Sequence, residues 1–144
     1  VIGLIVLFGT KALFTIGDQA CKNERADFER RIVRYIDDYS DKGSVKEEKL
    51  TLSQCKANQL CLVDIEFLND PTALPTAPPV IRTSVINGKN NIFLNTTFME
   101  PIGLSEKLKL APGSSPLCLD ISKGYIRLSF TGQGKTTFVA PAAP

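Results

Sequence analysis

The sequence predicts an α+β fold, in which a long N-terminal hydrophobic/amphipathic helix is followed by a small antiparallel β-sheet domain. Three observations predict it. Residues 1–40 contain no proline and keep helical spacing. After Gly43 apolar and polar residues alternate, as in half-buried strands. Four well-separated cysteines follow a hydrophobic N-terminus, which is typical of a small disulfide-bonded domain. We place the helix at 1–40, with a hydrophobic part at 1–17 and an amphipathic part at 18–40, and an extracytoplasmic β domain at 44–144.

The first 17 residues contain no acid and one base, Lys11. At ~1.5 Å rise per residue they cover about 25 Å as a helix, slightly less than a ~30 Å hydrocarbon core. The segment is a short membrane span, a trimmed longer one or a signal-peptide core. Because the chain starts at Val1 without Met, we expect a processed or trimmed protein that keeps this segment. In a lone span Lys11 would extend toward the headgroups. In a packed helical bundle it would need a carboxylate or carbonyl partner, and the candidates are Asp18 of its own chain and Asp18 of a neighbour.

The second part of the helix carries its apolar residues on one stripe. Phe28, Ile32, Tyr35 and Tyr39 recur at steps of four, three and four. Gly17 is the one soft point before this part, and Gly43 is a plausible C-terminal cap. We therefore expect one helix of roughly 40 residues, ~60 Å long. Its stripe should cover one face of the sheet.

Period-two alternation predicts a sheet of five to seven strands in the β domain. A proline-rich stretch, 69–79, is expected to be an extended connection. Asn87-Gly88 is a strong hairpin signal between two strands. The clearest strand, 125–130, should form a meander with the segments before and after it. The candidate strands, from which the five to seven are drawn, are 50–52, 63–67, 80–86, 91–94, 104–110 (the weakest), 117–121, 125–130 and 136–139.

The cysteines are Cys21, Cys55, Cys61 and Cys118. They form no CxxC pair, and the chain has no His, so a zinc site is disfavoured. Two disulfides in an oxidising compartment are favoured over four free thiols in a cytosolic protein. Three pairings are possible. We prefer Cys55–Cys61 with Cys21–Cys118, because a polar turn at 56–59 separates the first pair.

Composition argues against several function classes. The absence of His removes the commonest general base and the commonest metal ligand. The net charge is +2, and the arginines at 25–34 are interleaved with acids, which indicates a solvated helix face and no nucleic-acid surface. We therefore expect no enzyme, no cofactor, no metal, no nucleic-acid partner and no small-molecule substrate.

Three short motifs that could indicate functional sites are better explained as ordinary structural features. Residues 132–137 end in Gly-Lys-Thr-Thr, but Ser129 stands where a phosphate loop needs glycine, so a hairpin turn is expected. The acids at 37, 38 and 41 match no calcium loop and read as a solvated helix end. Asp64 and Glu66 read as the wet side of a strand. We assign none of them a catalytic role.

Asn95-Thr96-Thr97 is an N-glycosylation sequon. In an exported domain we expect Asn95 to carry a sugar, which requires the strand end near Leu94 to face solvent.

An apolar half-helix, an amphipathic half-helix and a compact β domain together resemble the type IV pilin family, particularly the shorter archaeal pilins. In that family the leader is processed, the apolar half-helices form a filament core and the β domains form the outer layer. Many pilins carry Glu at the fifth mature position, where this chain has Ile5. The resemblance implies an assembly core made of Val1, Ile2, Leu4, Ile5, Leu7, Phe8, Lys11, Leu13 and Phe14.

The expected function is therefore a structural subunit of an extracellular, pilus-like filament at the cell surface. Its partners would be copies of itself in a helical polymer and, before assembly, the membrane. The physical reason is burial, since large apolar side chains cost ~1.5–3 kcal/mol each when left in water. The alternative is a monomeric, membrane-anchored extracytoplasmic binding domain.

Overall fold

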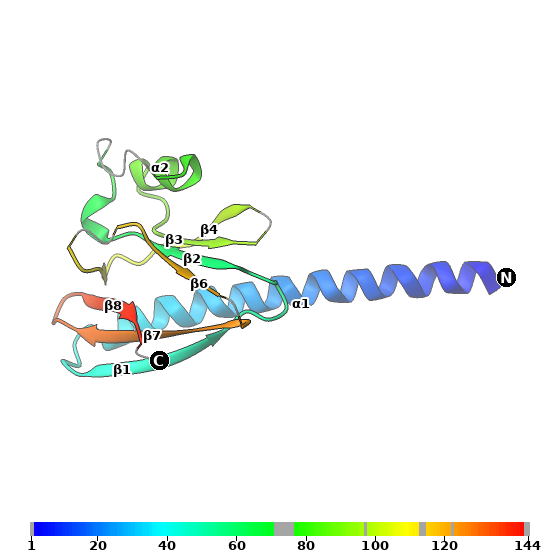
Figure 1. The fold of residues 1–144 in the computed structure, drawn as a ribbon, viewed down its shortest axis with the longest axis horizontal. Helices are drawn as coiled ribbons and strands as arrows, with labels where there is room; N and C mark the ends of the chain where they lie inside the picture. The colour runs from blue at the N-terminus through cyan, green and yellow to red at the C-terminus, as the bar shows by residue number, and fades with distance from the viewer. Residues whose placement is uncertain (1, 71–76, 97, 113–114, 122, 143–144) are drawn as a thin grey trace.

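The computed structural model is an α+β protein whose long N-terminal helix lies along a β domain of two small sheets (Figure 1). It describes the backbone of residues 2–70, 77–96, 98–112, 115–121 and 123–142, and side chains from residue 19 onward. The helix α1 spans Ile2–Tyr39. This agrees with the single unbroken helix that the sequence predicts. The side chains of the expected hydrophobic part, 1–17, and of Asp18 lie outside the described residues.

The first sheet contains β1 (Val45–Thr51), β7 (Tyr125–Gly132), β8 (Thr137–Pro141) and β5 (Leu108–Lys109), in the order β1-β7-β8-β5. β7 pairs antiparallel with both β1 and β8, whereas β5 pairs parallel with β8. The predicted hairpin around residues 132–137 is confirmed, because β7 and β8 pair directly across it.

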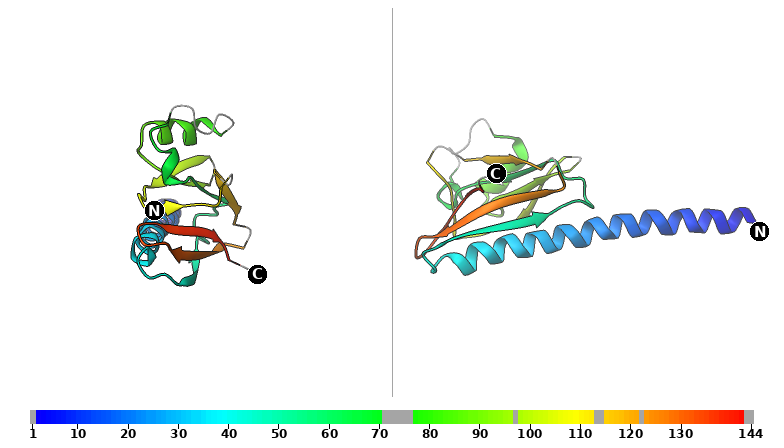
Figure 2. Two further views of the ribbon diagram at one scale, coloured as in Figure 1. Left: turned by 90° about the vertical axis from the view of Figure 1, so that its left-hand side faces the viewer. Right: turned by 60° about the horizontal axis from the view of Figure 1, so that its bottom comes forward.

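The second sheet contains β2 (Gln59–Leu62), β3 (Ile92–Asn95), β4 (Met99–Gly103) and β6 (Leu117–Asp120), in the order β4-β3-β2-β6. All its pairings are antiparallel. The two views of Figure 2 show the sheets as separate layers beside α1. The prediction of one sheet is therefore wrong, since the described strands form two.

The main core lies where α1 and the two sheets meet. Phe28, Ile32 and Ile36 of the helix are at most 2% exposed, and Tyr35 and Tyr39 pack at the edge. The apolar stripe that the sequence predicts thus covers the β domain as expected. Both sheets supply the opposite side of this core, through the buried residues Leu50, Leu60, Leu62, Ile92, Leu94, Ile126, Leu128 and Phe130.

A second, smaller core lies on the other side of the second sheet, under the helix α2 (Pro79–Ile86). Because side chains of a strand alternate between faces, Cys61 of β2 and Phe93 of β3 point into this core while their neighbours enter the main one. From α2, Ile81 and Val85 are buried against them. The central strands are therefore buried on both faces.

The strand predicted at residues 80–86 and the hairpin at Asn87-Gly88 are wrong, because this segment is α2. Pro79 begins the helix, a position at which its fixed φ and missing N–H are harmless. Ile81 and Val85 are four residues apart and so share one helical face. Gly88 has φ +66° and caps the helix instead of turning a hairpin, because both structures need the same left-handed backbone.

The predicted C-terminal meander is half right. Residues 117–121 contribute β6, but β6 pairs with β2 in the other sheet. The reason is that both edges of β7 are already occupied, by β1 and β8. The strand predicted at 63–67 is also wrong: residues Ile65–Phe67 form a short 3₁₀ helix (η1).

Candidate functional site

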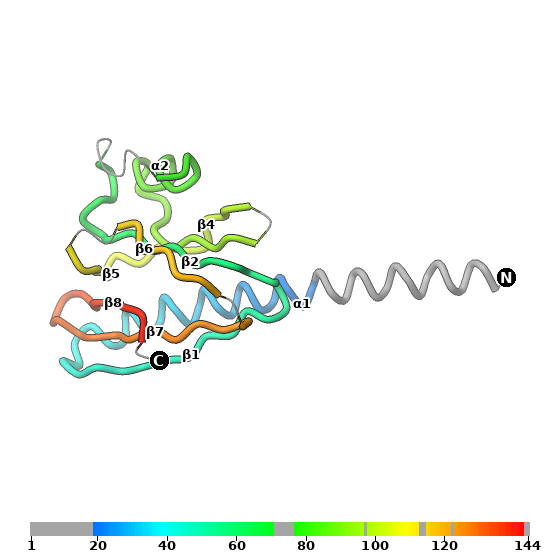
Figure 3. The backbone as a smooth tube through the Cα atoms, viewed as in Figure 1, coloured from blue at the N-terminus to red at the C-terminus, as the bar shows by residue number. Residues whose placement is uncertain are grey.

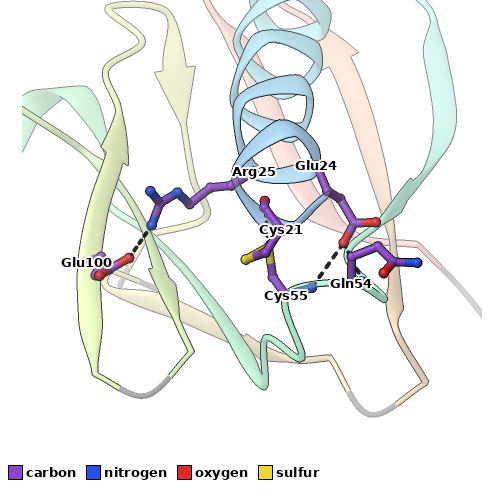
Figure 4. The surroundings of a disulfide bond; sticks show 6 residues. All are labelled: Cys21, Glu24, Arg25, Gln54, Cys55 and Glu100. Atoms are coloured by element: carbon purple, nitrogen blue, oxygen red, sulfur yellow. Dashed lines mark hydrogen bonds and ion pairs between the residues drawn. A yellow bond between two sulfur atoms is a disulfide. The ribbon is translucent and has the colours of Figure 1, made fainter. Parts of the chain in front are cut away.

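The described feature most relevant to function is the clamp that fastens α1 to the β domain (Figure 4). A disulfide joins Cys21, in α1, to Cys55, in the loop after β1. Three residues further along the helix, the Glu24 carboxylate accepts hydrogen bonds from the backbone N–H groups of Gln54, at 2.8 Å, and Cys55, at 3.4 Å. The loop is therefore held to the helix by one covalent bond and by charge-assisted hydrogen bonds.

A second contact holds the same helical turn to the other sheet. Arg25 Nη1 donates to Glu100 Oε2 of β4 at 2.6 Å. In Figure 4 the two side chains reach toward each other from the helix and from the strand, with the disulfide between this pair and Glu24. The turn from Cys21 to Arg25 thus ties together one loop of the first sheet and one edge strand of the second.

The predicted disulfide pairing is wrong, although all four cysteines are disulfide-bonded as expected. The second bond joins Cys61 to Cys118, which lie directly opposite in the register of β2 and β6. Cys55 cannot pair with Cys61, because β2 runs away from the loop and carries Cys61 into the core under α2. Two disulfides are what an exported protein in an oxidising environment would contain.

The other end of α1 is anchored without a covalent bond. Gly132 approaches the end of the helix so closely that a Cβ would collide with the carbonyl oxygen of Tyr39. Gly134 N donates to Ser40 O at 2.7 Å, and Thr137 Oγ1 donates to Ile36 O. The hairpin between β7 and β8 therefore supplies donors for carbonyls that the helix end leaves unpaired.

Three loops gather around the turn of α1 that carries Cys21, near the middle of the helix, and we call them the collar. They are the β1–β2 loop (52–58), the β3–β4 turn (96–98) and the β6–β7 loop (121–124), of which residues 97 and 122 are not described. Backbone hydrogen bonds join them. Leu52 N donates to Gly124 O at 2.7 Å, Asn58 N to Asn95 O at 2.9 Å, and Ile121 N to Asn58 O at 2.9 Å. The collar lies at the end from which α1 continues toward its N-terminus (Figure 3).

An open groove of about 570 Å³ lies along α1, beside Leu104 of the segment that follows β4. Its apolar strip is made by Ala26, Val33 and Leu104, and its charged rim by Glu29, Arg30, Arg34, Asp37 and Asp38. Nearby, Asp27 pairs with Arg30 and Arg31 on the same helix, as expected for a solvated face. The groove mixes charges of both signs and contains no nucleophile paired with a base, so we assign it no catalysis.

Sequence reasoning missed one polar cluster. Asp64 is only 2% exposed, so the prediction of a wet strand face was wrong for it. Its carboxylate accepts from the N–H groups of Glu66 at 3.0 Å and Leu110 at 2.8 Å. Lys109 Nζ lies 3.1 Å from Glu66 and 3.5 Å from Asp64, and the hydrogen bond with Glu66 raises its pKa. This cluster caps η1 and fixes β5. The alternation of apolar and polar residues could not reveal this role, because it does not distinguish a buried Asp that caps a short helix from a polar residue on the solvent side of a strand.

The remaining predicted positions are placed as follows. Asn95 ends β3 and is half-buried, beside the collar. The nine residues of the expected assembly core, and the expected partnership of Lys11 with Asp18, lie outside the described residues. Within the described part of the chain, no group of three or more metal-ligating side chains occurs. The same part contains no helix that is long and apolar enough to cross a membrane.

Comparison of this chain with protein-family models, with curated proteins and with solved structures gives no match. The functional argument therefore depends on the chain's own residues.

Proposed function

We propose that this protein is a non-enzymatic structural subunit of an extracellular, pilus-like filament, and that it assembles through the hydrophobic first part of its helix. The observation that carries the proposal is the asymmetry of α1. One helix, Ile2–Tyr39, contains an apolar sequence up to Gly17 and a second part whose stripe is buried by the β domain.

The burial of that stripe is central to the argument. Phe28, Ile32 and Ile36 already have their partners inside the chain. The apolar sequence before Gly17 still requires partners, because each large apolar side chain costs ~1.5–3 kcal/mol in water. In a filament, copies of the same segment provide those partners. Before assembly, a membrane provides them.

The clamp supports the same function. A subunit that transmits tension or bending from a helical core to an outer domain needs a stiff junction between the two. The bond between Cys21 and Cys55, the hydrogen bonds of Glu24 and the ion pair of Arg25 with Glu100 all act within one helical turn. They also lie within ~12 Å of Gly17 along the helix axis, at 1.5 Å per residue.

Imaging of the purified full-length protein by electron microscopy tests the proposal. We expect filaments with helical symmetry, with residues 1–17 at the axis. Deletion of 1–17 should abolish filaments and give a soluble monomer, because the core formed by Phe28, Ile32 and Ile36 lies outside the deleted segment.

A matched pair of point variants separates loss of assembly from loss of folding. Leu7→Asp should prevent filament formation, since it places a charge in the apolar segment, while Leu7→Ile should preserve it. Both variants should keep the thermal unfolding temperature of the β domain. A dispersed, lipid-bound monomer under all conditions would contradict the filament and would favour the membrane-anchored binding domain.

A further inference from the structure

The collar lies where the apolar part of the helix gives way to the β domain. The three loops surround the end of the domain near Cys21, through which the disulfide ties them to α1. In Figure 1 the connections β1–β2, β3–β4 and β6–β7 all lie at the end of the domain that faces the N-terminus. Cys21 comes four residues after Gly17, which is ~6 Å along a helix.

This distance matches the headgroup layer of a bilayer. The layer adds ~5–8 Å on each side of a ~30 Å hydrocarbon core. If the sequence up to Gly17 is in the hydrocarbon, the Cys21 turn is at the depth of the lipid phosphates. The collar loops, fastened at this turn, then face the lipid surface.

The side chains of the collar suit such a surface. Phe98, in the β3–β4 turn, is 64% exposed, although it is a large apolar residue. Three lysines at the same end of the domain are also exposed: Lys22 on the helix, and Lys56 and Lys123 on the other two loops. Among the described residues these lysines form no ion pair.

The acids at this end are mostly engaged. Glu24 accepts from the backbone of the β1–β2 loop, and Glu100 pairs with Arg25. Asp120, at the end of β6, is exposed. At this end of the domain the described residues thus include three exposed lysines without an ion pair and one exposed acid, Asp120.

We propose that the collar docks on an anionic lipid surface, with Phe98 at the headgroup level and Lys22, Lys56 and Lys123 against the phosphates. An exposed apolar side chain such as Phe is stabilised at the boundary between headgroups and acyl chains, and lysines near the surface are attracted by anionic lipid, with about a fivefold gain in binding for each. The inference rests on the membrane-bound stage of the proposed function. Docking would hold the β domain in one orientation before the subunit joins a filament.

The chain contains no Trp, so a single introduced Trp reports on one position. The full-length Phe98→Trp variant is placed in vesicles of phosphatidylcholine and phosphatidylglycerol that contain brominated lipid, which quenches a nearby Trp. We expect strong quenching and a blue-shifted emission. The control is Val45→Trp. Val45 is 61% exposed and pairs with Thr131 beside the anchored end of α1, so its Trp should stay unquenched.

A third reporter makes failure of this inference distinguishable from failure of the proposed function. Phe8→Trp lies in the apolar segment and should be quenched whenever that segment is in lipid. Quenching of Phe8→Trp without quenching of Phe98→Trp would overturn the docking alone. Absence of quenching at both positions would overturn the membrane-bound stage as well.

The lysines are tested in the Phe98→Trp background. Changing Lys22, Lys56 and Lys123 to Glu should lower the ratio of docked to undocked protein by more than tenfold. The reason is that each lysine near an anionic surface contributes about fivefold to binding. Changing Lys42, Lys46 and Lys135, near the other end of the domain, to Glu should have little effect. Equal losses in both triple variants would contradict a specific role for the collar. The protein is produced in a host without N-glycosylation, so that Asn95 is in the same unmodified state in every variant.

Discussion

At the collar, α1 is held by a disulfide and by charged side chains, whereas at its C-terminal end it is held by buried apolar residues and by backbone contacts. These two regions of the helix differ in how much apolar area they bury. Ile32 and Ile36 are fully buried near the C-terminal end. Cys21, Glu24 and Arg25 are partly exposed, so they contribute through bonds and charge. Where α1 buries little apolar area, a disulfide bond holds it to the β domain instead.

The largest effect is expected at the packed end. Ile36→Ala should destabilise the protein by about 2–5 kcal/mol, because it removes three buried carbons and leaves a cavity among α1 and both sheets. Val33→Ala is the control on the same helix, and it should cost clearly less since Val33 is only half-buried. Denaturant unfolding measures both. Equal costs would mean that the packed end is not the main anchor.

Loss of the clamp disulfide should have the next largest effect. Replacing Cys21 and Cys55 by Ser opens a loop with a sequence separation of 34 residues, which should cost about 2–4 kcal/mol. Hydrogen exchange tells where the helix loosens. We expect faster exchange of the amides of Glu24 and Arg25, and little change at Ile36. Uniform acceleration along α1 would show that the two ends are not held independently.

The ion pair between Arg25 and Glu100 should contribute less. Its side chains are 37% and 26% exposed, so solvent and salt screen the charges. A double-mutant cycle with Arg25→Ala and Glu100→Ala should give a coupling of at most ~1 kcal/mol, and the coupling should shrink in high salt. A coupling unaffected by salt would contradict this interpretation.

The smallest expected effect is the pH dependence of stability that comes from Tyr39, at the C-terminal end of α1. The hydroxyl of Tyr39 donates to Glu48 at 2.8 Å, and this hydrogen bond, with burial, raises the pKa of Tyr39 to about 12. A raised pKa means that the folded state keeps the proton longer than the unfolded state. The stabilisation is therefore complete below about pH 10 and is lost as pH rises toward 12.

Ultraviolet absorbance of tyrosinate measures that ionisation. Glu48→Gln should lower the pKa of Tyr39, because it removes the negative charge next to the ionising oxygen. No difference between wild type and Glu48→Gln would contradict the assigned cause.

The sequence by itself determined the features that depend on local order. Helical spacing of Phe28, Ile32 and Tyr39 gave the length of α1 and the face that it buries. Alternation in 125–130 and the glycines at 132 and 134 gave the β7–β8 hairpin. In each of these the residues that decide the structure are neighbours along the chain.

Only the tertiary structure decided which distant segments meet. The pairing of Cys61 with Cys118 follows from the register of β2 and β6, and the bond of Cys55 with Cys21 follows from the path of a loop over the helix. Asn87-Gly88 fits both a hairpin and a helix cap, since each needs the same left-handed backbone at Gly88, and only the core under α2 selects the helix. Asp64 likewise became a buried cap because two segments far apart in the sequence supply its donors. Local pattern fixes conformation, but contact between distant segments depends on how all the buried surfaces are satisfied together.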